Sequence, residues 1–124
     1  MKTKLRINFD KVSTAELPCF KIDIPLYRCH ILVLDKKQSK RLGELWGSPD
    51  DYGAMVNNYL KESQKIILRV FEYSDANIVH ELHHTVDMIM DYIDHEKNAE
   101  SDEPSAYLMT YLYEEVMKIK KYLK

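Results

Sequence analysis

The sequence predicts a single α+β domain, because several segments with strand-like patterns precede two long segments with helical spacing. With 124 residues, 45% of them hydrophobic, the chain can bury one core without disulfide staples. No internal repeat, low-complexity segment or linker is visible in it. We therefore expect one domain over residues 1–124, in which a small mixed or antiparallel sheet packs against helices.

A first hairpin is predicted around Pro25. Phe20, Ile22 and Ile24 alternate with polar residues, and an apolar strand over 28–34 follows the proline. The second of these strands is the more apolar. We expect it to be the more deeply buried of the two.

A helix and a turn are expected next. Asp35 can accept a hydrogen bond as the N-cap of a helix that ends near Trp46, with Gly47 after it. Residues 48–51, Ser-Pro-Asp-Asp, are typical of a turn.

A second hairpin is predicted from 53–59 and 64–73, with its turn near 61–63. Lys65 to Phe71 is rich in β-branched and large apolar residues. If this strand lies at the edge of the sheet it can pair with an extended peptide, and if it lies inside the sheet it belongs to the core. The sequence leaves both possibilities open.

A long helix is expected from a cap at Ser74 or Asp75 to about Ile93. Its core-facing stripe repeats at spacings of three and four residues: Val79, Leu82, Val86, Ile89 and Ile93. Further apolar residues widen this face, so we expect both the sheet and another helix to cover it. The polar line His80, His84, Asp87 and Asp91 is expected to border a cleft.

The last helix follows a polar, acidic loop over 94–103. Pro104 suits its first turn, which places Asp102 or Glu103 at the cap. We expect this helix to return antiparallel to the preceding one.

Composition and sequence patterns argue against a nucleic-acid partner, a membrane span and secretion. The net charge of −2 comes from 18 basic and 20 acidic residues without a basic stripe interleaved with aromatics, so nucleic acid is not expected. No apolar run approaches the ~18 residues of a membrane span. Residues 1–9 lack the apolar region of a secretory signal. We expect a soluble, cytoplasmic protein in which Cys19 and Cys29 are reduced, although a disulfide across the hairpin stays possible.

The most informative motif is His80-Glu81-Leu82-His83-His84, an H-E-x-x-H string within the predicted long helix. Residues four apart share a helix face, so His80 and His84 can bind one metal ion. Glu81 can reach a water on that ion and accept its proton without becoming a ligand. These residues predict a zinc site with a general base. The alternative is an amphipathic helix whose histidines are ordinary surface or core residues.

Two histidines need a further ligand, because a catalytic zinc usually keeps three protein ligands and one open position. We predict Glu103 at the head of the last helix, since an antiparallel return brings that helix beside the first. Glu100 and Asp102 are the alternatives.

The motif helix, the acidic loop and the segment Asp102-Glu103-Pro104-Ser105-Ala106-Tyr107-Leu108 resemble the small HExxH proteins of phages and prophages. Those proteins are similar to the minimal gluzincins, whose third ligand is a glutamate on the following helix. The resemblance covers about residues 22–123 and implies a zincin-like core. It further implies zinc held by His80, His84 and Glu103, with Glu81 as base.

Two tyrosines on the last helix are candidates for stabilising an oxyanion. Tyr107 and Tyr111 follow Glu103 by one and two turns, and a phenol can donate a hydrogen bond there. Their alternative role is aromatic packing in the core.

The remaining polar residues have weaker roles. Asp87 is either a partner that orients a ligand imidazole or a plain surface residue. His83 lies about a hundred degrees off the ligand face, and His30 and His95 have no motif around them.

The function expected from these residues is hydrolysis of a peptide bond in a protein or peptide substrate by a zinc metallopeptidase. The alternative is a non-catalytic binding or assembly protein on the same scaffold. Since the resemblance is to phage and mobile-element proteins, it also implies a possible partner protein from a mobile element.

Overall fold

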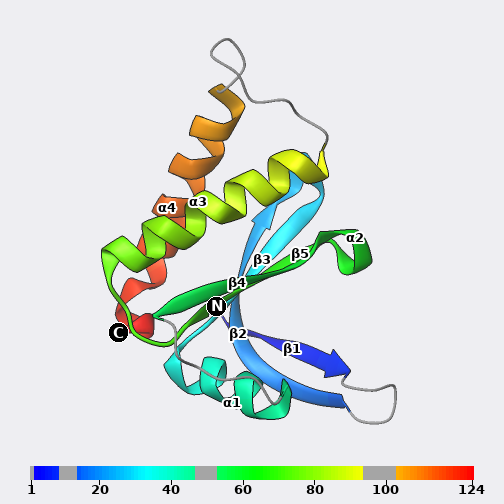
Figure 1. The fold of residues 1–124 in the computed structure, drawn as a ribbon, viewed down its shortest axis with the longest axis vertical. Helices are drawn as coiled ribbons and strands as arrows, with labels where there is room; N and C mark the ends of the chain where they lie inside the picture. The colour runs from blue at the N-terminus through cyan, green and yellow to red at the C-terminus, as the bar shows by residue number, and fades with distance from the viewer. Residues whose placement is uncertain (1, 9–13, 47–52, 94–102) are drawn as a thin grey trace.

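The computed structural model describes residues 2–8, 14–46, 53–93 and 103–124, with side chains from residue 17 onward. Its centre is a five-stranded mixed sheet with strand order β1-β2-β3-β5-β4 (Figure 1). The strands are β1 (Lys2–Asn8), β2 (Thr14–Ile24), β3 (Cys29–Leu34), β4 (Ala54–Tyr59) and β5 (Lys65–Val70). Neighbours pair antiparallel except β3 and β5, which are parallel. The predicted α+β class is confirmed.

Helices cover both faces of the sheet (Figure 1). The helical segments are η1 (Pro25–Tyr27), α1 (Lys36–Trp46), α2 (Leu60–Ser63), α3 (Asp75–Tyr92) and α4 (Glu103–Leu123). Leu42 of α1 packs on one face, while apolar residues of α3 and α4 fill the larger core on the other. Because both faces are buried, the inner strands β3 and β5 are almost continuously apolar.

Both predicted hairpins are confirmed, and each closes through a short helical turn. The 3₁₀ turn η1 joins β2 to β3 and is followed by its C-cap Arg28, whose φ is 54°. The single turn α2 joins β4 to β5 and is followed by its C-cap Gln64, whose φ is 56°. A left-handed residue at the end of each turn reverses the chain into the next strand.

The predicted helix after Asp35 is also confirmed. The Asp35 Oδ1 atom accepts a hydrogen bond from the Gln38 amide at 2.9 Å, and α1 ends at Trp46. The predicted turn over 48–51 lies outside the described residues. The strand β1, which pairs with β2, was not predicted.

The strand order settles two open questions. The strand β5 lies between β3 and β4, so Lys65–Val70 belongs to the interior, and β4 is the neighbouring edge among the described strands. Cys19 and Cys29 are both buried and form no disulfide, and they belong to the two separate core clusters. Their positions exclude a disulfide between them.

None of the helices in the described ranges has the length and apolar character needed to cross a membrane.

Candidate metal centre

The helix α3 brings His80 and His84 together on its exposed face. Their Nε2 atoms lie 3.1 Å apart, and the two rings meet edge to face. An ion placed about 2.1 Å from each nitrogen makes a nitrogen–ion–nitrogen angle of about 95°, which is compatible with a distorted tetrahedral site. The pair therefore has the spacing that a shared metal ion requires.

Glu81 completes this group from the buried side of the helix. It is only 9% exposed, and ligand atoms of His80, Glu81 and His84 all lie within 4.8 Å of one another. Burial raises the pKa of the Glu81 carboxyl, an effect that the two neighbouring imidazoles oppose. Among the described residues, this is the one group of three metal-binding side chains at such distances.

The amino end of α3 is fixed by a local cap. The Ser74 Oγ atom accepts a hydrogen bond from the Asn77 amide at 3.0 Å, so Ser74 is the cap of the two residues that the sequence allowed. The Asn77 side chain in turn donates to the Glu72 carbonyl at 3.2 Å. These contacts hold the first turn of α3 against the segment that follows β5, so the cap helps to fix the orientation of the histidine-bearing helix.

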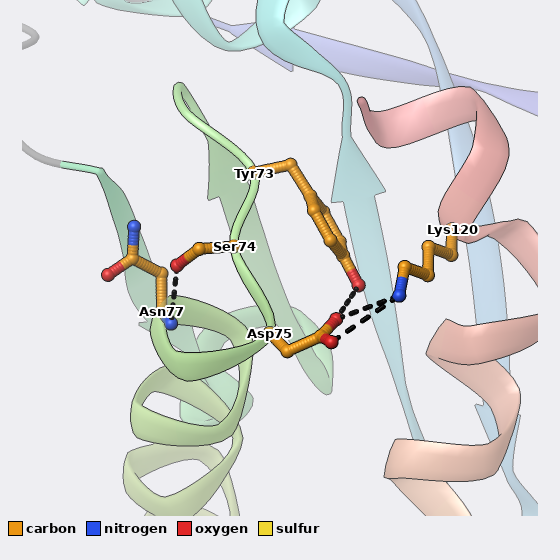
Figure 2. Close-up of polar contacts among 5 residues, drawn as sticks. All are labelled: Tyr73, Ser74, Asp75, Asn77 and Lys120. Carbon is orange, nitrogen blue, oxygen red and sulfur yellow. Dashed lines mark hydrogen bonds and ion pairs between the residues drawn. The ribbon is translucent and has the colours of Figure 1, made fainter.

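A second set of contacts ties α3 to α4 (Figure 2). The Tyr73 hydroxyl donates to Asp75 Oδ1 at 2.6 Å, and the Lys120 ammonium lies 3.1 Å from the same oxygen. The Lys120 ammonium also lies 5.6 Å from the centre of the Tyr73 ring. The carboxyl end of α4 therefore meets the amino end of α3, and α4 returns in the opposite direction as predicted.

This arrangement does not bring Glu103 to the two histidines. Glu103 begins α4, at the end far from Lys120, and it is absent from the group formed by His80, Glu81 and His84. It lines a groove beside η1. The alternatives Glu100 and Asp102 lie outside the described residues.

The two tyrosines predicted to act on an oxyanion lie at the same groove. The Tyr111 hydroxyl donates to the Asp23 carbonyl at 2.6 Å, so it binds the backbone of β2. Burial raises the pKa of this phenol. Tyr107 is 73% exposed, so the alternative of core packing does not describe it.

The other predicted polar residues that the structure describes are not part of the group formed by His80, Glu81 and His84. Asp87 Oδ2 lies 3.6 Å from Nε2 of His83, so this contact is to an imidazole outside the proposed ligand pair. His83 is exposed, in agreement with its predicted position. His30 is half-buried on β3, where burial and Lys21 lower its pKa. His95 lies outside the described residues.

Sequence reasoning missed one residue that positions the site. Gly53 precedes the edge strand β4, and its carbonyl accepts hydrogen bonds from the amides of Phe71 and Glu72. A Cβ atom at this position would lie 2.3 Å from Asn77 Nδ2. A glycine as the first residue of a predicted strand is the signal that could have indicated such a close approach.

Comparison with known proteins adds no family to this geometry. No family model matches the chain, and no match was found among the curated proteins or the solved structures. The functional argument therefore depends on the side chains themselves.

Proposed function

We propose that the chain is a zinc-dependent metallopeptidase in which His80 and His84 hold the metal and Glu81 is the general base. The observation that carries this proposal is the 3.1 Å separation of the two Nε2 atoms beside a buried carboxylate. Two imidazoles and a neighbouring carboxylate are the donor set that zinc hydrolases use. The residues present fit the metal.

A bound zinc ion supplies a Lewis acid that polarises a peptide carbonyl and acidifies water. Glu81 lies next to both ligands, so its carboxylate can accept a proton from water and pass it to the leaving amine. Its low exposure limits competition from bulk solvent. The chain thereby has a proton acceptor where peptide hydrolysis needs one.

The edge strand β4 supports a peptide as the substrate. It lies at the edge of the described sheet on the side where Gly53 approaches the first turn of α3. The outer backbone groups of an edge strand can pair with an extended peptide. In the proposed arrangement, this role falls to β4, since β5 is internal. A sheet with such an edge beside the motif helix is the zincin-like core that the proposal assumes.

The third ligand stays a prediction, because Glu103 lies outside the group of three side chains whose ligand atoms are within 4.8 Å of one another. A crystal structure of zinc-loaded protein with anomalous data at the zinc edge identifies the third ligand directly.

The proposal is tested by zinc stoichiometry and turnover of matched variants. We expect native mass spectrometry to find one zinc ion in wild type and in Glu81→Gln, and none in His80→Ala. We expect Glu81→Gln to cleave a peptide library at least about 10²-fold more slowly, because the proton acceptor is lost.

His83→Ala is the matched control, since it removes an exposed imidazole of the same helix and leaves the proposed ligands in place. It is expected to keep both zinc and turnover. Zinc binding by His80→Ala equal to that of wild type contradicts the metal site. Normal zinc with no cleavage by wild type favours the alternative of a non-catalytic binding protein.

A further inference from the structure

A groove lies between the β2–β3 turn and the first turns of α4, and we call it the tyrosine groove. It has a volume of about 570 Å³ and is lined by residues 24–27 together with Glu103, Pro104, Tyr107, Leu108 and Tyr111. The size falls within the range of ligand-binding clefts. Its position on η1 and α4 separates it from the metal-binding group on α3.

The walls of the tyrosine groove are apolar and aromatic, and much of that surface is open to solvent. Leu26 is 81% exposed and Tyr107 is 73% exposed. Since the Tyr111 hydroxyl already donates to the Asp23 carbonyl, the part of Tyr111 that can contact a ligand is its ring. Exposed apolar surface gathered around a hollow is a property of binding sites.

The charge of the groove comes from Glu103, which is the one charged residue among its described lining residues. No described lysine or arginine forms an ion pair with Glu103. A carboxylate at an apolar, aromatic groove is therefore available to a cation from outside.

We propose that the tyrosine groove binds a lysine or arginine side chain of another polypeptide. The methylene stem of such a side chain packs on Leu26 and Leu108, as long basic side chains do on apolar surfaces. Its cationic head faces the tyrosine rings and the Glu103 carboxylate, which attract it by cation–π and ion-pair interactions. A neutral apolar side chain lacks these electrostatic attractions, and the Glu103 carboxylate repels an acidic side chain. The proposal does not depend on zinc.

The test uses two acetylated, amidated pentapeptides, Gly-Ala-Xaa-Ala-Gly, in which Xaa is lysine or the neutral, nearly isosteric norleucine. Each is titrated into the full-length, ¹⁵N-labelled protein, and amide shifts along α4 are followed. We expect the lysine peptide to shift the amides around Tyr107 and to bind about fivefold more tightly than the norleucine peptide. We expect 0.5 M salt to reduce this preference. Butylamine at the same concentration is expected to bind more weakly, since it lacks the backbone of a peptide.

Variants separate the proposed contacts. Glu103→Gln and Tyr107→Leu are each expected to reduce the preference for lysine, while Glu114→Gln, an exposed residue outside the groove, is expected to keep it.

Zinc affinity is measured in parallel by calorimetry. A Glu103→Gln variant that loses zinc affinity but keeps the lysine preference overturns the groove proposal and supports Glu103 as the metal ligand. Equal binding of the two peptides by wild type, or butylamine binding as tightly as the lysine peptide, also overturns it. Loss of the lysine preference with zinc affinity unchanged supports the groove and leaves the metal site intact.

Discussion

At the residue scale, Gly53 shows how one position sets the distance between the edge strand and the helix that carries the motif. The space that a Cβ atom would need is occupied by the Asn77 amide group, which itself donates to the Glu72 carbonyl. The side chain of Asn77 can rotate away, but only by giving up that hydrogen bond. Glycine at 53 therefore allows strand and helix to meet while the first turn of α3 stays capped.

We predict that Gly53→Ala lowers the free energy of unfolding by about 1 kcal/mol, the usual net contribution of one hydrogen bond. The measurement is urea denaturation followed by circular dichroism. In an Asn77→Ala background the same substitution should cost much less, because the obstructing group is gone. Equal costs in the two backgrounds would show that the contact with Asn77 is not the reason for glycine.

At the element scale, the parts of the structure that depend on local sequence could be predicted. Both hairpins, the cap at Asp35 and the helix from Ser74 were predictable because alternation, turn residues and caps act over a few neighbouring positions. The position of His80 beside His84 follows from helix geometry alone. Local rules were sufficient for the two proposed ligands and the proposed base.

The order of strands and the register of α4 could not be predicted, because they depend on contacts between distant residues. Nothing within Lys65–Val70 shows that β4 lies outside it. The prediction that Glu103 meets the histidines assumed that α4 runs back along α3. The sequence does not specify which residues of the two helices then face each other. In the structure, Lys120 meets Asp75 and Tyr111 binds the Asp23 carbonyl, and these two contacts place the head of α4 beside η1.

The contact between α3 and α4 predicts a dependence of stability on pH. The Tyr73 hydroxyl and the Lys120 ammonium lower the pKa of the Asp75 carboxyl below its ordinary value. A group with a lowered pKa in the folded state contributes stability above its unfolded pKa and loses it as pH falls through the folded pKa. Asp75→Asn should therefore be less stable than wild type at pH 7 and equal to it near pH 2.

The measurement is thermal unfolding of both proteins across this pH range. Because Asp75 is exposed, the difference at pH 7 is expected to be small and to shrink in high salt. Glu72→Gln, an exposed neighbour, serves as the control and should show no such difference. A difference that persisted at pH 2 would mean that Asp75 acts through packing rather than through its charge.

At the scale of the whole molecule, the proposed metal site and the fold depend on each other. His80 and His84 converge only when the segment is helical, and that helix is held by its cap, by α4 and by the sheet. In the unfolded chain the same two imidazoles are not held together. A ligand that binds the folded chain alone adds its binding free energy to the free energy of unfolding.

We therefore predict that zinc raises the melting temperature of the protein. At a free zinc concentration of 100 times Kd, the added stability is about 2.7 kcal/mol, which for a domain of this size corresponds to roughly 10 °C. His80→Ala should abolish the shift, while His83→Ala should retain it, because His80 is paired with His84 and His83 is not. Differential scanning calorimetry in zinc and in a chelator gives the comparison. An equal shift in wild type and His80→Ala would mean that zinc binds elsewhere in the chain. No shift in wild type would contradict the proposed zinc site.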